Sequence, residues 1–266
     1  MVREHYRNML SKDLQNLYDA LCKDIIAMND KIKVHVYCDV ENAQAEIMQD
    51  ISDVMYLIAL DHPEILWYAH QKKNIDGAGS VCITSSIEGW NATVVPTYYK
   101  DAYNAVMPKY SFFEFTEREI AMRVLQEMIK HIIYDKNHGV QSAYGVACLG
   151  TGVCMGYALY FKWLLEKNGI SCKVIVGDAG TDGKKEPHAW CVANLDGEDC
   201  YIDPTWCDPI VNGKQEHVVD ETWFGFNPND GTHIEEMEFN KYFDGSLDRA
   251  GWYGDRFDPD DLSLVL

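Results

Sequence analysis

The sequence of 266 residues predicts an α+β fold, and three observations lead to this class. A capping box, TERE at 116–119, opens an amphipathic helix that we expect over 118–135. A largely apolar helix is expected to run from near Cys154 to Gly169. Three strand-like segments follow it, at 171–178, 188–195 and 199–206. Helices followed by a run of strands are typical of an α+β domain.

The N-terminal part has its own pattern of helices and strands. Helical spacing of leucine and isoleucine predicts helices over 11–29 and 41–60, with a strand between them at 31–38. Two further strand-like runs lie at 80–87 and 91–99. We therefore expect an N-terminal helix-and-strand region of unknown role over 1–105. A core domain with an acidic C-terminal extension is expected over 106–266, in which the chain from 207 on reads as irregular structure with short helices.

Composition and charge exclude several classes of function. Apolar residues make up 47% of the chain, which is enough for a hydrophobic core, and the net charge is −19. A phosphate backbone requires a basic surface, so we expect no nucleic-acid partner. No run approaches the ~20 apolar residues of a membrane span, so no membrane insertion is expected. The N-terminus lacks the apolar stretch of a signal peptide, which predicts a cytoplasmic protein, or a secreted or cell-surface one if a signal was removed. The sequence leaves the oligomeric state open.

Nine cysteines are present, and their spacing does not indicate a metal site. They lie at 22, 38, 82, 148, 154, 172, 191, 200 and 207, and no two form a C-x-x-C pair. The spacing therefore predicts no zinc ribbon, and the chain is long for a disulfide scaffold. We expect no metal and no cofactor, a reduced environment, and at least one free thiol.

Cys154 differs from the other cysteines in its surroundings. It stands in GVCMGYA, between Gly152 and Gly156, at the expected start of a helix. The positive end of the helix dipole favours a thiolate there, and the unpaired N–H groups of the first turn can bind a negative oxygen. The two glycines permit the close approach of a substrate or of a neighbouring element. This cysteine is our candidate nucleophile, although most free cysteines only fill space in a core.

A candidate base and its partner follow on a predicted hairpin. His188 opens one strand, and Asp203 comes near the end of the next. Asp196-Gly197 between the strands predicts a two-residue type I′ turn, which pairs Leu195 with Glu198 and puts His188 and Asp203 on one face, about 7–8 Å apart at their Cα atoms. Cys154, His188 and Asp203 then have the residue types and order of a nucleophile, a base and an orienting carboxylate.

Four further residues are candidates for supporting roles. Gln141 and Tyr144 lie shortly before the cysteine, and either can donate a hydrogen bond to an oxyanion; the plainer interpretation is a loop residue and a packed aromatic ring. Trp190 and Trp206 follow the histidine and the aspartate, where they can shield the ion pair from water or simply belong to the core.

The motifs GVCMGYA, HAW and DPTW, in that order, resemble those of the transglutaminase-like superfamily of papain-related thiol enzymes, in its bacterial type. The likeness covers about residues 110–210. It implies a core in which a helix bearing the nucleophile packs on an antiparallel sheet that carries the histidine and the aspartate. It also implies that Cys154, His188 and Asp203 are the catalytic residues.

The sequence differs from the animal cross-linking members of this superfamily at positions that bear on the activity. Animal cross-linking members have Gln before and Trp after the cysteine, where this chain has Val153 and Met155. The calcium-loop pattern is also missing, because Phe226 precedes NPNDG where the first ligand would stand. We therefore expect a cysteine-dependent enzyme that acts on amide bonds of a protein or peptide through a Cys154 acyl-enzyme. Hydrolysis and acyl transfer both stay open, and the alternative is a non-catalytic binding or structural module of the same fold.

Overall fold

The structure is a computed structural model. It describes residues 4–26, 31–36, 38, 40–65, 71–75, 80–85, 113–137, 139–181, 183–235, 240–244, 246–249 and 252–253. The chain divides into two compact units, the first formed by residues 1–5, 59–66 and 89–238, and the second by residues 6–58, 67–88 and 239–266. The domain boundary expected at 105/106 lies outside the described residues.

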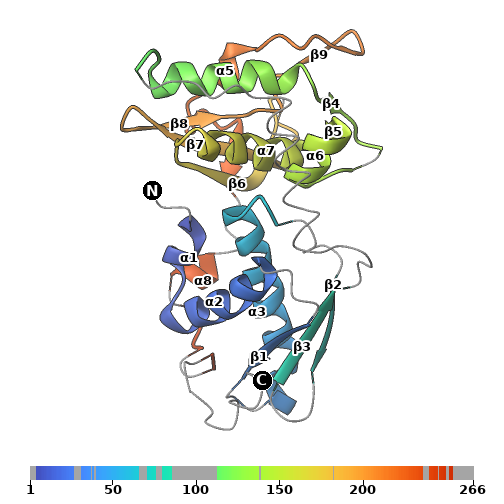
Figure 1. Ribbon diagram of the computed structural model, residues 1–266, viewed down its shortest axis with the longest axis vertical. Coiled ribbons are helices and arrows are strands. Elements are labelled where there is room, and N and C mark those ends of the chain that lie inside the picture. The colour runs from blue at the N-terminus through green and yellow to red at the C-terminus, as the bar shows by residue number, and fades with distance from the viewer. Residues whose placement is uncertain are drawn as a thin grey trace. The chain divides into compact units, whose positions relative to one another are not determined.

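The first unit is built on a four-stranded antiparallel sheet (Figure 1). Its strands are β6 (Cys172–Ala179), β7 (Glu186–Leu195), β8 (Glu198–Ile202) and β11 (His233–Glu235), in the spatial order β11-β6-β7-β8. Together with the helices described next, this sheet confirms the predicted α+β class.

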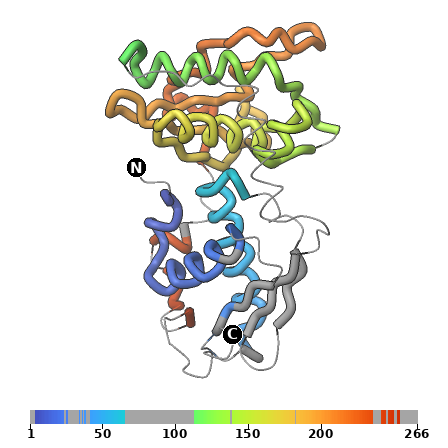
Figure 2. The backbone as a smooth tube through the Cα atoms, viewed as in Figure 1, coloured from blue at the N-terminus to red at the C-terminus, as the bar shows by residue number. Residues whose placement is uncertain are grey.

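Three helices accompany this sheet, and their path through the chain can be followed in Figure 2. They are α5 (Glu117–Ile129), α6 (Ala143–Leu149) and α7 (Cys154–Lys167). Helix α7 packs against β6 and β7, and both α5 and α6 pack against α7. Helix α7 is buried along most of its length, which explains why its sequence is apolar on nearly every side.

The segments around these helices differ from the sequence prediction in two places. Helix α5 starts with the predicted capping box but ends at Ile129, because the chain then enters a short parallel pair of β4 (Ile133–Tyr134) and β5 (Thr151–Gly152). Helix α6 occupies a segment that reads as a loop. Its local signals are Ser142, which caps it by accepting from the Gly145 N–H, and Gly150, which ends it in the left-handed conformation.

The β7–β8 hairpin has the predicted turn and register. Asp196 and Gly197 both have positive φ angles, 56° and 91°, as a type I′ turn requires. Leu195 pairs with Glu198, and the ladder continues to Cys191 and Ile202. It ends there, although the sequence predicted a strand to 206. The Asp203 side chain accepts hydrogen bonds from the backbone N–H groups two and three residues on, which turns the chain, and Pro204 has no N–H to extend the ladder.

Short elements fill the segment after the hairpin. A small antiparallel pair of β9 (Ile210–Val211) and β10 (Lys214–Gln215) is followed by a 3-10 turn, η2 (Glu221–Trp223). The chain then reaches β11, which pairs His233 with Ala179 of β6.

The second unit combines helices with a three-stranded antiparallel sheet of order β1-β3-β2. Its elements are α1 (His5–Met9), α2 (Lys12–Ile26), β1 (Lys31–His35), α3 (Val40–Asp61), β2 (Gln71–Ile75), β3 (Ser80–Ser85) and α8 (Asn240–Phe243), with the first residue of α1 and the last three of α3 counted in the first unit. The strand predicted at 91–99 lies outside the described residues. Among the helices that the structure describes, none is long and apolar enough to cross a membrane.

Part of the predicted C-terminal extension belongs to the second unit. Arg249 binds Asp50 of α3 through Nε at 2.6 Å and Nη2 at 3.2 Å, and the Tyr253 hydroxyl donates to the same carboxylate at 3.0 Å. These contacts join two segments that lie about 200 residues apart in the sequence. Residues 254–266, which carry most of the acidic end, lie outside the described residues.

Candidate active site

Cys154 is the first residue of α7, and the glycines around it serve the packing of neighbouring segments. Its predecessor Val153 is the N-cap in an extended conformation and makes no side-chain cap hydrogen bond. A Cβ on Gly156 would lie 2.8 Å from the carbonyl oxygen of Val140, and one on Gly152 would lie 2.5 Å from a methyl group of Val146. Only glycine therefore lets the loop and α6 approach this close to the start of α7.

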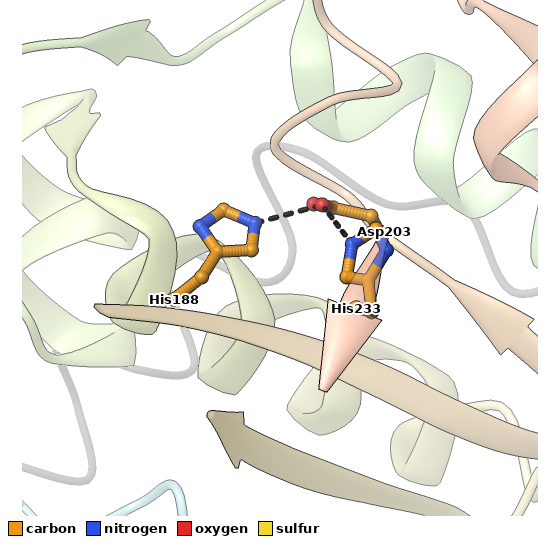
Figure 3. Close-up of side chains that lie close together, drawn as sticks. All are labelled: His188, Asp203 and His233. Atoms are coloured by element: carbon orange, nitrogen blue, oxygen red, sulfur yellow. Dashed lines mark hydrogen bonds and ion pairs between the residues drawn. The ribbon is translucent and has the colours of Figure 1, made fainter. Parts of the chain in front are cut away.

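His188 and Asp203 lie in direct contact, as Figure 3 shows. The Nε2 atom of His188 is 2.7 Å from Oδ2 of Asp203, across the end of the β7–β8 hairpin. This contact leaves Nδ1 of His188 for the thiol of Cys154, whose electrostatic interaction with the ring affects the pKa values of both groups. The structure thus brings the three residues together, while their catalytic roles stay a prediction.

The carboxylate of Asp203 is fully buried and held by four hydrogen bonds. Its Oδ1 atom accepts from the backbone N–H groups of Thr205 at 2.9 Å and Trp206 at 3.0 Å. Its Oδ2 atom accepts from two imidazole rings, those of His188 and His233. A buried carboxylate with all its lone pairs engaged has one fixed orientation, so it can fix the orientation of His188 in turn.

The pKa of the Cys154 thiol is held below its ordinary value of 9.0. Burial of the sulfur alone would raise this pKa, but the hydrogen bond and the charge of His188 oppose it and win. Backbone hydrogen bonds at Ala189 and Met155 add to the lowering. The site therefore favours a thiolate, which is the nucleophilic form of cysteine.

The pKa of His188 moves the other way, to about 10. Burial of the ring would lower it, and the hydrogen bonds and charges of Asp203 and Cys154 raise it by more. The pKa of Asp203 is lowered, because hydrogen bonds from His188 and His233 outweigh the effect of burial. The three directions agree with a thiolate, an imidazolium and a carboxylate side by side.

His233 is the residue at this site that the sequence did not reveal. It begins β11, its side chain is 1% exposed, and its Nε2 atom is 3.0 Å from Oδ2 of Asp203 (Figure 3). It lies 30 residues after the aspartate, in a segment rich in glycine and asparagine that reads as irregular. The local pattern of alternating apolar and polar residues is only three residues long, from His233 to Glu235, which is too short to predict a strand.

The two tryptophans predicted beside the site enclose these rings. The Trp206 ring centroid is 5.4 Å from that of His188 and 4.7 Å from that of His233. Trp190 is buried and contacts His233 edge-on at 5.0 Å. Apolar rings around a charged group exclude water and strengthen its interactions, and this role stays a prediction for both tryptophans.

A cleft of about 830 Å³ opens beside His188 and is lined by Val153, Thr205 and Trp206. Gln141 also lines it. Tyr144 is not among its lining residues, and its hydroxyl hydrogen-bonds instead to the thiol of Cys148, one turn along α6. The structure therefore brings Gln141 to the cleft and turns Tyr144 toward another group.

Tyr134, which lines the cleft, is a second residue near the site that the sequence did not single out. Its pKa is raised to about 12, first by burial and then by the negative charges of Cys154 and Asp203. Its hydroxyl therefore keeps its proton over the neutral range and can donate a hydrogen bond into the cleft.

The ligand atoms of His188, Asp203 and His233 lie within 4.8 Å of one another, which is close enough to consider a metal ion. Such a set escapes a search for ligand spacing because the three residues lie 15 and 30 residues apart in the sequence. Both imidazole nitrogens are already in hydrogen-bonding contact with the carboxylate, and these bonds account for the arrangement.

Comparison with known proteins agrees with this geometry. The profile of the transglutaminase-like superfamily matches residues 113–235, a range that contains α5 to β11 and all the residues of the site. No curated protein matches the chain in sequence.

Several solved structures are similar to part of the chain. "Crystal structure of a TGase" is 18% identical with a TM-score of 0.33, and covers 55% of this chain and 46% of that one. A structure from Cytophaga hutchinsonii described as a "Putative Cysteine Protease" is 12% identical with a TM-score of 0.34, and covers 62% of this chain and 65% of that one. The matches span less than two thirds of either neighbour. The sequence profile, in contrast, confirms the predicted resemblance: residues 113–235 match the model of the transglutaminase-like superfamily.

Proposed function

We propose that the protein is a thiol enzyme that acts on amide bonds of a protein or peptide through an acyl-enzyme at Cys154. The observation that carries the proposal is the Cys154–His188–Asp203 arrangement at the start of α7. There the pKa of the thiol is lowered and the pKa of the imidazole is raised. Active sites are where such opposed shifts are found together in a cleft.

The first half of the proposed reaction forms a thioester. The Cys154 thiolate attacks the amide carbonyl carbon, and the carbonyl π electrons move to the oxygen. In this proposal, backbone N–H groups at the start of α7 and the Gln141 side chain donate hydrogen bonds to this oxyanion. When the intermediate collapses, the C–N bond breaks and the leaving amine takes a proton from Nδ1 of His188.

The second half releases the acyl group. His188, now neutral, takes a proton from water or from a primary amine, and the oxygen or nitrogen attacks the thioester carbon. The C–S bond breaks, the thiolate returns, and the product is an acid or a new amide. Throughout, Asp203 holds the ring of His188 in one orientation and stabilises its positive form.

A protein or peptide substrate fits the size and the walls of the cleft. Its volume of about 830 Å³ lies within the range of roughly 300–1,000 Å³ that is usual for ligand-binding clefts. Aromatic rings of Trp206, Trp223 and Tyr134 line it beside polar groups. This mixture suits one amide-bearing side chain or a short stretch of peptide.

The test is covalent trapping with a peptide chloromethyl ketone, followed by intact mass and peptide mapping. We expect one adduct, at Cys154, in the wild-type protein, none in Cys154→Ala, and much slower formation in His188→Phe. An adduct on another cysteine, or one that survives in Cys154→Ala, would rule the proposal out. Peptide substrates incubated with and without a primary amine then separate hydrolysis from acyl transfer by product mass.

A further inference from the structure

The carboxylate of Asp203 has a second imidazole partner, which the mechanism above does not use. His233 and His188 are both in hydrogen-bonding contact with Oδ2 of Asp203, at 3.0 and 2.7 Å. The two histidines reach it from different strands of one sheet. Because His233 pairs with Ala179, and Ala179 with Glu186, His233 lies on the same sheet face as His188.

The ring of His233 is fixed at both of its nitrogens. Its Nε2 atom faces Asp203, and its Nδ1 atom is 2.9 Å from Oγ1 of Thr232. The Thr232 hydroxyl also donates to Asp230 at 2.6 Å, so one chain of contacts runs from Asp230 through Thr232 to the ring. A flip of the ring would break both contacts, which makes this a defined orientation.

Aromatic rings close in on His233 from several sides. Phe226 stacks on it at 4.2 Å between centroids, and Trp206, Trp190 and Trp223 follow at 4.7, 5.0 and 5.8 Å. The hydrogen bond to Asp203 is shielded from solvent, because the His233 side chain is 1% exposed and the carboxylate is fully buried. A buried carboxylate that loses a donor becomes easier to protonate.

We propose that His233 is a positioning residue for the thiol chemistry: it donates to Oδ2 of Asp203 and so keeps this carboxylate ionised and turned toward His188. The inference rests on the proposed function and extends it. Without His233, burial of Asp203 is opposed by fewer hydrogen bonds. The carboxylate is then neutralised at a higher pH, the imidazolium of His188 loses support, and the thiolate of Cys154 forms only at higher pH.

The experiment measures the rate at which iodoacetamide alkylates Cys154 as a function of pH, by peptide mass, in wild type, His233→Phe and His233→Gln. Phe keeps an aromatic ring in the enclosure and removes the donor. Gln keeps a neutral donor near the position of Nε2. We expect the midpoint of the His233→Phe profile to rise by about one pH unit, the effect of losing one charge-assisted hydrogen bond, and the His233→Gln profile to return close to wild type.

Phe226→Leu is the matched packing control, because it disturbs the same cluster and leaves the hydrogen bond in place. We expect it to lower stability without moving the midpoint. An unchanged midpoint in folded His233→Phe, or an equal shift in Phe226→Leu, overturns the inference. If His233→Phe does not fold by circular dichroism, His233→Met takes its place, because a flexible apolar side chain also removes the donor to Asp203. A rise of the midpoint then supports the inference, and an unchanged midpoint overturns it.

Asp203→Asn separates this inference from the proposed function. If Asp203→Asn moves the pH profile of Cys154 alkylation and His233→Phe does not, the proposed function is supported and the proposed role of His233 is wrong. If wild-type Cys154 titrates near the ordinary 9.0 and Asp203→Asn changes nothing, the proposed function falls and takes the inference with it.

Discussion

At the scale of single residues, the account depends on one carboxylate acting through one imidazole. Asp203 is fully buried, and its short contact with His188 is the reason that the histidine pKa rises although burial lowers it. A side chain that only turned the chain before Pro204 would need its Oδ1 contacts with the backbone and nothing at Oδ2. The contacts at Oδ2 therefore indicate a second role for Asp203, which is to bind the imidazole rings.

The substitution Asp203→Asn tests that role. The thiol pKa lies below 9.0 in the wild type, so the reactive thiolate is present above that lowered value and is lost as the pH falls through it. Without the negative charge His188 is less easily protonated, and the alkylation profile of Cys154 moves to higher pH. We expect the acylation rate at neutral pH to fall on the order of 10²–10³, less than in a serine enzyme because the thiolate is already ionised.

The measurement is alkylation rate against pH in both proteins, with circular dichroism to show that each is folded. Identical profiles would show that Asp203 has no part in the chemistry and would favour a binding module.

At the scale of elements, helix α7 places the thiol, and its first turn depends on a close approach to the preceding loop. A methyl group on Gly156 would meet the Val140 carbonyl oxygen at 2.8 Å, and a backbone atom cannot move aside as a flexible side chain can. We expect Gly156→Ala to cost about 1–3 kcal/mol in the free energy of unfolding, as other overpacked sites do.

The loop that must shift in Gly156→Ala carries Gln141, so we also expect slower acylation of Cys154. Urea unfolding and the trapping rate measure the two effects. A variant with wild-type stability and wild-type trapping would mean that the loop has room that the structure does not show.

The middle of α7 holds a buried ion pair. Lys162 Nζ is 2.7 Å from Oε1 of Glu166 and 2.8 Å from the carbonyl oxygen of Cys172, and the two side chains are 1% and 5% exposed. Glu166→Ala leaves a buried ammonium without its anion, and we expect a cost of about 3–5 kcal/mol.

The double variant Lys162→Met/Glu166→Leu removes both charges, so we expect it to be more stable than Glu166→Ala in urea unfolding. If the single variant is the more stable of the two, the pair does not behave as a buried ion pair.

Several of these elements could be predicted because their signals are local. The pairing of His188 with Asp203 follows from one dipeptide, Asp196-Gly197, which fixes which side chains share a face. His233 could not be found in this way, because its three-residue strand takes its place from β6, more than 50 residues away. The hydrogen bond between Tyr144 and Cys148 was also not predicted, because the segment that carries both residues reads as a loop and not as the helix α6.

At the scale of the whole molecule, Arg249 and Tyr253 of the C-terminal segment are tied to Asp50 of α3 within the second unit. The Asp50 carboxylate is 1% exposed and depends on Arg249 for its charge partner and on Tyr253 for one hydrogen bond. We expect Arg249→Met to lower the free energy of unfolding of the second unit by about 3 kcal/mol, because the buried Asp50 carboxylate loses its cationic partner.

Arg7→Met is the control for that substitution. Its partner Asp19 is 48% exposed, and we expect a loss of less than about 1 kcal/mol, as for other surface ion pairs. Urea unfolding of both variants measures the difference. Equal losses would mean that the Asp50–Arg249 contact is as weak as a surface pair.

The central claim, that Cys154 is the nucleophile, is tested most directly by limiting iodoacetamide on the native protein at neutral pH, with peptide mapping of the first cysteine labelled. If exposure alone decided the labelling rate, Cys148 would react first, because it is exposed and Cys154 is half-buried. The residue Cys148 is exposed, but neighbouring atoms cover part of its sulfur, and this partial burial raises its thiol pKa, whereas the pKa of Cys154 is lowered. The account predicts that Cys154 is labelled first, and that His188→Phe removes this advantage. Faster labelling of Cys148, or of any other cysteine, would contradict it.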